Sequence, residues 1–186
     1  MSSALAPHHP ISVDDYIVGE SQTDIRHEYV DGQVYAMGGA SRAHGLIVNA
    51  LAFELTPAAR NKACQLFTSD MKVRLSIAGK DVFYYPDLLL TCDPEDRDNY
   101  YSSRPCLIVE VLSESTERID RREKFLSYQT LPSLQAYVLI AQDVPLVEVY
   151  RRATEWQPEY YESGAVFFDC LEATVNVADI YRDVNP

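Results

Sequence analysis

The sequence predicts a mixed α/β fold in which one central sheet is flanked by helices. Two apolar runs rich in β-branched and aromatic residues, 82–92 and 106–112, are typical of buried strands. Segments that are typical of helices, 41–60 and 120–130, lie before and after these strands. The chain has 186 residues, of which 47% are hydrophobic, so it can bury a full-sized core.

For the N-terminal part of the chain, the sequence predicts a leader, a short helix and a hairpin. Residues 1–11 are expected to be a flexible leader that precedes a single domain of residues 12–186. Ser12 is a suitable N-cap for a short helix. Two strand-like segments then flank Asp31-Gly32, a dipeptide that favours the positive φ angles of a two-residue hairpin turn.

The middle of the chain predicts a long helix followed by strands. Ser41 can cap a helix that runs to about Arg60, and Pro57 would kink or end it. In residues 71–77 the apolar side chains alternate with polar ones, which is typical of a strand with one buried face. Residues 93–105 are polar and acidic, so we expect a loop there.

The last third predicts one more helix and further strands. Asp120 and Glu123 have the spacing of a capping box, so a helix is expected from there to about Thr130. Residues 136–140 and 146–150 are typical strands. Short elements complete the chain.

Composition limits the cellular setting and the partners. The four cysteines form no Cys-x-x-Cys pair, so we expect reduced core cysteines rather than disulfides or a zinc site. No apolar run is long enough to span a bilayer and the N-terminus lacks signal-peptide features, so we expect a cytoplasmic protein without a membrane partner. The net charge of −12 argues against tight, non-specific binding of nucleic acid, although it allows a local basic groove.

Asp87 and Glu110 are acids inside the two apolar runs. Burying a carboxylate is costly unless a positive group meets it. Side chains alternate along a strand, so Asp87 shares a face with Leu89 and Glu110 shares a face with Leu112. If the strands pair, the two acids can hold Mg²⁺ (or Mn²⁺), which prefers oxygen ligands and keeps waters that can attack a phosphorus. The pattern indicates a metal-dependent phosphodiester hydrolase.

Lys124 is the candidate for the cation that such a site also needs. It lies one turn into the helix that follows the Glu110 strand, and Tyr128 is on the same helical face. Its long aliphatic stem can reach back over the carboxylates. Lys72 and Arg74 are the alternative cations.

The same residues resemble those of a known family. Pro86-Asp87, the run Glu110-Val111-Leu112-Ser113, and Asp120 with Glu123-Lys124 and Tyr128 resemble the Uma-type restriction endonuclease family common in cyanobacteria. That family belongs to the PD-(D/E)xK nuclease superfamily. The resemblance extends upstream to Glu28, Asp31-Gly32 and His44, and it covers roughly residues 12 to 180.

This resemblance implies a restriction-endonuclease-like fold with a central mixed β-sheet and a magnesium-dependent site that hydrolyses DNA. Carried over by position, Asp87 and Glu110 would be the catalytic metal ligands, and Glu28 would be an accessory acid. The lysine that the superfamily places two residues after the acid is Leu112 here, which points to Lys124 as its replacement. Nucleases of this fold often pair to cut both strands, so a homodimer is expected.

Each candidate residue also has a structural alternative. Asp87 could simply end a strand, and Glu110 could form a salt bridge with Lys124 or Arg74 without any catalytic role. Glu28 beside a hairpin turn is most often a surface residue. His44 is more often a helix-start or packing residue than a base.

Three functions therefore remain open. The first is a magnesium-dependent endonuclease acting on DNA. The second is a catalytically inactive or regulatory relative that keeps the fold as a dimeric interaction module, which the acidic surface and the missing standard lysine favour. The third is a phosphoesterase on small substrates, which would need no basic groove.

Overall fold

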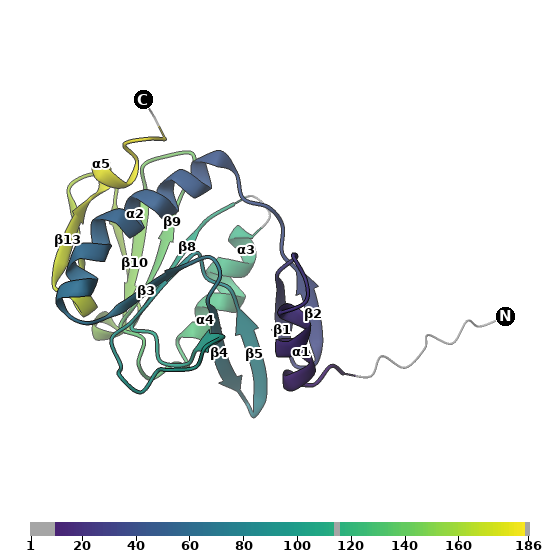
Figure 1. Ribbon diagram of the computed structural model, residues 1–186. Coiled ribbons are helices and arrows are strands. Elements are labelled where there is room, and N and C mark those ends of the chain that lie inside the picture. The colour runs from purple at the N-terminus through teal and green to yellow at the C-terminus, as the bar shows by residue number, and fades with distance from the viewer. Residues whose placement is uncertain (1–9, 114–115, 185–186) are drawn as a thin grey trace.

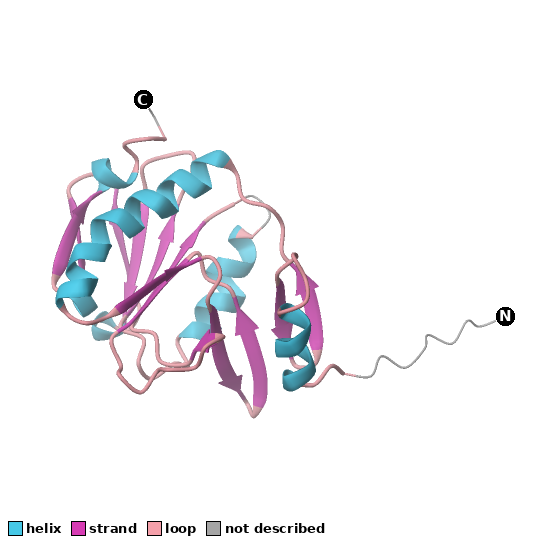
Figure 2. Ribbon diagram, viewed as in Figure 1, coloured by secondary structure: helices cyan, strands magenta, loops and turns pink. Residues whose placement is uncertain are grey.

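The computed structural model describes residues 10–113 and 116–184, and it confirms the α/β class (Figures 1 and 2). The strands divide among a six-stranded central sheet, a five-stranded N-terminal sheet and a two-stranded sheet. Helix α2 (Arg42–Asn61) covers one face of the central sheet, and α3 (Glu117–Ile119) and α4 (Phe125–Tyr128) lie near its other face (Figure 1).

The central sheet has the strand order β11-β10-β9-β8-β6-β3. It is mixed, because β8 and β9 are parallel and every other neighbouring pair is antiparallel. Its strands are β3 (Gln65–Thr68), β6 (Leu88–Thr91), β8 (Leu107–Val111), β9 (Ala136–Ile140), β10 (Val147–Arg151) and β11 (Pro158–Tyr161).

The N-terminal sheet has the order β2-β1-β5-β4-β7, with α1 (Val13–Glu20) packed on one face. Its strands are β1 (His27–Val30), β2 (Gln33–Ala36), β4 (Lys72–Ile77), β5 (Lys80–Tyr84) and β7 (Tyr101–Ser102). The two-stranded sheet pairs β12 (Ala165–Phe168) with β13 (Ala173–Asn176), and α5 (Val177–Ile180) follows it. Three 3₁₀ or π-helical turns complete the elements: η1 (Asp120–Lys124), η2 (Arg152–Thr154) and η3 (Asp169–Leu171).

Two hydrophobic clusters hold the sheets and helices together. One packs α2 (Arg42–Asn61) against the central sheet, where Leu51 and Leu55 of the helix meet Leu90 and Val109. The other joins the two larger sheets around Tyr128, which is completely buried. This second cluster lies on the face of β8 that also carries Glu110, so it brings the N-terminal sheet close to that acid.

The N-terminal caps and the hairpin turn form as the sequence predicts. The Ser12 side chain accepts a hydrogen bond from the backbone N–H of Asp15, and Ser41 accepts one from His44. Asp31 and Gly32 have φ angles of 48° and 87°, as a two-residue turn requires. Pro57 does not end α2, which continues to Asn61.

The helix that carries Lys124 begins earlier than the capping-box pattern predicts. Helix α3 (Glu117–Ile119) leads into the π-helical turn η1 and then into α4 (Phe125–Tyr128). Asp120 therefore lies inside the helical segment, where it is buried 3.3 Å from Lys124, and it is not an N-cap. The Asp120 carboxylate therefore forms an ion pair with Lys124 and does not cap the start of the helix.

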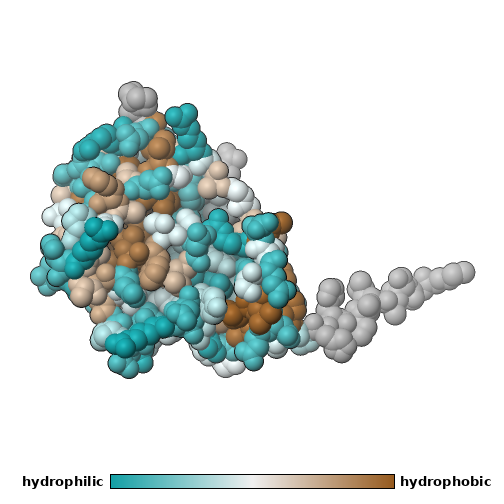
Figure 3. Space-filling model, in the orientation of Figure 1, coloured by the Kyte–Doolittle hydropathy of each residue, from teal (hydrophilic) through white to brown (hydrophobic). Residues whose placement is uncertain are grey.

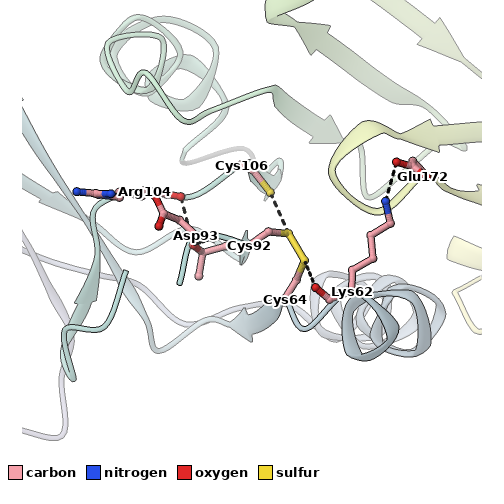
Figure 4. The surroundings of a disulfide bond; sticks show 8 residues. Lys62, Cys64, Cys92, Asp93, Arg104, Cys106 and Glu172 are labelled. Atoms are coloured by element: carbon pink, nitrogen blue, oxygen red, sulfur yellow. Dashed lines mark hydrogen bonds and ion pairs between the residues drawn. A yellow bond between two sulfur atoms is a disulfide. The ribbon is translucent and has the colours of Figure 1, made fainter. Parts of the chain in front are cut away.

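The prediction of four reduced cysteines is wrong for Cys64 and Cys92, which form a disulfide (Figure 4). The register of β3 and β6 places Gln65 opposite Thr91, so the next residues in each direction, Cys64 and Cys92, face each other. Directly opposite side chains on neighbouring antiparallel strands are close enough to be bridged. Cys106 and Cys170 are free thiols.

Residues 1–9 of the expected leader lie outside the described residues. Ile11, which the prediction placed in the leader, is attached to the fold: its N–H donates to the carbonyl of Gly32, and its carbonyl accepts from the Tyr29 hydroxyl. On the face in Figure 3, apolar side chains gather over the α1 region, and exposed hydrophobic residues there include Ile11 and Val18. In the described part of the chain, we find no helix with the length and hydrophobicity to cross a bilayer.

Candidate functional site

Asp87 immediately precedes β6. Because β6 and β8 are antiparallel, the start of β6 lies beside the C-terminal end of β8. The register of these antiparallel strands pairs Leu88 with Val109, so Asp87 lies opposite Glu110 and on the same face. The Asp87 Oδ2 atom accepts a 2.7 Å hydrogen bond from the backbone N–H of Val111. This bond holds the carboxylate of Asp87 against the end of the Glu110 strand.

His44 is the second partner of Asp87. It lies in the first turn of α2, which Ser41 caps, and its Nε2 atom is 2.9 Å from Oδ1 of Asp87. The two oxygens of Asp87 are therefore held by different elements, one by β8 and one by α2. The expectation that His44 is a helix-start residue is met, and the structure adds its contact with the candidate acid.

Glu110 is buried, with 3% of its surface exposed. Its Oε1 atom is 3.2 Å from Nζ of Lys124 and accepts a 3.1 Å hydrogen bond from the Tyr128 hydroxyl. Lys124 and Tyr128 are four residues apart on one helical segment, so their side chains project to the same side. That shared direction lets one helix supply both a charge and a hydroxyl to one carboxylate.

Lys124 is the centre of a group of acids from three elements. Its Nζ atom lies 2.9 Å from Glu28 on β1, 3.2 Å from Glu110 on β8 and 3.3 Å from Asp120 on η1. The ammonium also lies 5.5 Å from the centre of the Tyr84 ring, a distance at which the ring's negative face attracts a cation. The lysine thereby joins the N-terminal hairpin to the central sheet.

The electrostatics of the group favour a further cation. Burial raises the pKa of Glu110 well above its usual range, and the charges of Asp120, Asp87 and Glu28 raise it further, while Lys124 lowers it. Burial also raises the pKa of Asp120, against the opposing effect of Lys124. Glu110 and Asp120 therefore take up protons more readily than they would in water, although both pair with Lys124.

Lys124 itself remains charged. Burial lowers its pKa, but the charges of Glu110, Glu28 and Asp120 outweigh burial and raise the pKa well above its ordinary value. The lysine is 5% exposed, so its ion pairs are little screened by solvent. It acts as a fixed positive charge within the carboxylate group.

The donor set of this group suits a hard divalent cation. Carboxylate oxygens are the ligands that Mg²⁺ prefers, and one or two carboxylates with waters are enough to bind it. Among the described residues, the Oε1 atom of Glu28 and the Oδ1 atom of Asp120 are buried and accept no hydrogen bond of good geometry. Both atoms form ion pairs with Lys124. Residues 10–113 and 116–184 contain no set of three or more His, Cys, Asp or Glu side chains already arranged around a metal position. Asp87 and Glu110 lie opposite each other on paired strands, so they are the residues that could hold such a cation.

The alternative cations do not reach this group. Lys72 is buried, and its Nζ atom lies 5.0 Å from the ring centre of Tyr85. Arg74 pairs with Asp81 and donates to the hydroxyl of Tyr101.

Sequence reasoning therefore selected the acids and Lys124, which the structure brings together with Glu28, but it missed the part played by Asp120. Asp120 lies four residues before Lys124, and this helical ion-pair spacing was the available signal. The spacing to Glu123 favoured a cap instead.

Comparisons with known proteins place the chain in a family. The family model Uma2, described as "Putative restriction endonuclease", matches residues 13–177. Two Synechocystis proteins, named "Uncharacterized protein slr1290" and "Uncharacterized protein sll1609", are 37% and 33% identical to the chain. The matches cover 81% and 79% of the chain and 78% and 84% of those proteins.

A solved structure is similar over nearly the whole chain. It is a crystal structure described as a putative nuclease belonging to DUF820 from Anabaena variabilis, with a TM-score of 0.74, 16% identity, and coverage of 94% of this chain and 99% of that one. At this identity the likeness shows the fold. The match of the family model over residues 13–177 shows more: the chain belongs to the Uma2 family of restriction-endonuclease-like proteins.

Proposed function

We propose that this protein is a magnesium-dependent endonuclease that hydrolyses phosphodiester bonds in DNA. The observation that carries the proposal is the position of Asp87 opposite Glu110 on paired strands, with Lys124 3.2 Å from Glu110. The same group is what a nuclease needs in one place: two oxygen ligands for a divalent cation and a fixed positive charge. Membership of a family whose model is described as "Putative restriction endonuclease" supports the same chemistry.

In this proposal Asp87 and Glu110 would hold Mg²⁺ or Mn²⁺. When bound, the cation would neutralise charge on the scissile phosphate and lower the pKa of a water molecule that attacks it. His44 and the Val111 N–H fix the direction of the Asp87 carboxylate, as hydrogen bonds behind a ligand usually do.

Lys124 and Tyr128 fix Glu110 in the same way. Each contacts Oε1 of Glu110, so the other carboxylate oxygen has neither of these contacts. The ion pair of Lys124 with Glu28 brings the hairpin acid to the edge of the site, where it supports the lysine. We propose that Lys124 positions the carboxylates of Glu28 and Glu110 and keeps positive charge beside the reacting phosphate.

The substrate is proposed to be DNA in spite of the net charge of −12. The protein as a whole repels a polyanion, so binding would depend on the cation and on local contacts. We therefore expect weak, strongly salt-dependent binding in the absence of divalent cations.

A plasmid-nicking assay tests the proposal. Supercoiled DNA is incubated with the full chain and 5–10 mM Mg²⁺ or Mn²⁺ (an order-of-magnitude choice that exceeds typical weak-site affinities), and nicked circles are measured on a gel. We expect nicking by the wild type that EDTA abolishes. Asp87→Asn should lose it, whereas the matched control Asp14→Asn, an exposed acid on α1, should keep it.

The alternative is an interaction module without catalysis. One observation favours it: Lys124 already pairs with three carboxylates, so the group is partly neutralised without a metal. A protein of this kind would nick no plasmid, and its melting temperature would not respond to millimolar Mg²⁺, because no binding equilibrium would be linked to folding.

A further inference from the structure

All four cysteines of the chain come together at one end of the central sheet, away from the carboxylate group. Cys64 precedes β3, Cys92 follows β6, Cys106 precedes β8, and Cys170 lies in the turn η3. Four separate segments thus bring their sulfur atoms to one place, although the sequence spreads them over more than a hundred residues. Figure 4 shows Cys106 beside the Cys64–Cys92 disulfide.

The contacts form a continuous row of sulfur atoms. The Sγ atom of Cys106 lies 3.8 Å from Sγ of Cys92, and because Cys92 is in a disulfide, Cys106 is the free thiol of that contact. Hydrogen bonding to Cys106, followed by burial, raises the pKa of the Cys170 thiol, so Cys170 remains a protonated neighbour of Cys106.

Accessibility changes along this row. Cys92 is exposed, Cys64 is partly buried, and Cys106 is 6% exposed. A thiol reductant from solution can reach the disulfide at Cys92, but it meets Cys106 only behind that disulfide. The buried thiol therefore has one sulfur partner at contact distance that it can attack, and that partner belongs to a disulfide.

We propose that Cys106 and the Cys64–Cys92 disulfide form an internal thiol–disulfide exchange site. The thiolate sulfur of Cys106 attacks Sγ of Cys92, a Cys92–Cys106 bond forms and the Cys64–Cys92 bond breaks. The electron pair leaves on the sulfur of Cys64, which takes up the proton that Cys106 lost. One disulfide and two thiols are present before and after, so the step needs no external oxidant or reductant.

The exchange moves a covalent link between strands. In the first state the disulfide ties the start of β3 to the end of β6, and in the second it ties the end of β6 to the start of β8. Strands β6 and β8 are direct neighbours, and the Sγ atoms of Cys92 and Cys106 already lie 3.8 Å apart. The second link therefore needs only a small local adjustment, and it frees the Cys64 end of the α2–β3 connection.

Peptide mapping of the full-length protein tests this site directly. The protein is held at pH 8, quenched in acid, alkylated with N-ethylmaleimide in denaturant and digested with trypsin. Cleavage after Lys62, Lys72, Lys80, Arg97 and Arg118 places Cys64, Cys92 and Cys106 on three different peptides. Mass spectrometry then distinguishes the two possible disulfides without any variant.

The expected result is a Cys64–Cys92 peptide pair together with a Cys92–Cys106 pair in the wild type. Cys106→Ser should lose the second pair and keep the first. Cys64→Ser, treated with oxidised glutathione, should gain the Cys92–Cys106 pair, and Cys170→Ser serves as the control that keeps both pairs.

Three results would overturn the proposal. One is a wild type that contains only the Cys64–Cys92 pair after prolonged incubation. Another is a folded Cys64→Ser variant, verified by circular dichroism, in which Cys92 and Cys106 never become linked. The third is stoichiometric binding of Zn²⁺ by the reduced protein with all four thiols protected, because this would make the cluster a metal site. None of these readouts depends on nuclease activity.

Discussion

The ammonium of Lys124 lies 2.9 Å from the carboxylate of Glu28, and this ion pair connects the N-terminal sheet to the central sheet. Glu28 belongs to the hairpin of the N-terminal sheet, whereas Lys124 belongs to the helical segment packed on the central sheet. The ion pair thus fixes the position of the hairpin relative to the strands that carry Asp87 and Glu110. It also explains why a buried lysine is tolerated, since three carboxylates surround it.

Replacing this lysine should be costly. Lys124→Met keeps most of the side-chain volume but leaves the buried carboxyl groups of Glu110 and Asp120 and the partly buried one of Glu28 without their cation, so we expect a loss of about 3–5 kcal/mol in the free energy of unfolding. Urea denaturation at pH 7 measures it. Arg122→Met is the control, because Arg122 is exposed on the same segment and its loss should change stability by less than about 0.5 kcal/mol. Equal effects of both variants would contradict the role of Lys124.

The pH dependence of stability should carry the signature of Glu110. Its pKa is raised in the folded state, so the folded protein binds more protons than the unfolded chain above the ordinary pKa of a glutamate. The contribution of Glu110 is therefore most favourable at pH below about 4.5 and decreases as the pH rises towards the folded-state pKa. In Glu110→Gln this decrease should be absent. Urea denaturation between pH 4.5 and 8 (the range above the ordinary pKa) checks it, and parallel profiles for both proteins would contradict it.

His44 should affect metal binding more than folding. Its contact with Asp87 orients one carboxylate oxygen, and removal of such a supporting partner typically weakens metal affinity about 10–100-fold. We expect His44→Ala to need a correspondingly higher Mn²⁺ concentration for half-maximal binding in calorimetry. The unfolding free energy should fall by only about 1 kcal/mol. Unchanged Mn²⁺ affinity in a folded variant would show that the contact has no such role.

Gly32 should be the more sensitive of two turn glycines. Both Gly32 and Gly79 have positive φ, so alanine strains either backbone by roughly 1–2 kcal/mol. A Cβ atom at Gly32 would also approach a side-chain carbon of Pro10 far inside contact distance, whereas one at Gly79 would meet no atom within 4 Å. Thermal denaturation should therefore rank Gly32→Ala below Gly79→Ala in melting temperature. The reverse order would show that residues around Pro10 move freely.

Local rules predicted much of the fold. The Asp31-Gly32 turn and the Ser12 and Ser41 caps each depend on residues within a few positions of one another, so they can be found in the sequence. The acids of the candidate site were found because Asp87 and Glu110 interrupt apolar runs, where a buried charge is costly unless a positive group meets it.

What the sequence could not give depends on contacts between distant segments. The Cys64–Cys92 disulfide bridges a separation of 28 residues and exists because β3 pairs with β6. Asp120 has the local pattern of a cap, and only the tertiary position of Lys124 assigns its charge to another use. The packing of the two larger sheets around Tyr128 likewise depends on distant segments, and periodicity alone does not show it.

The central claim is that Asp87 and Glu110 together bind one divalent cation. Anomalous diffraction from a crystal grown with Mn²⁺ tests it most directly. We predict one manganese peak at roughly 2.0–2.3 Å from a carboxylate oxygen of each residue, a range typical of such ions. A crystal with manganese bound only elsewhere, or with none between these two acids at saturating Mn²⁺, would contradict the claim.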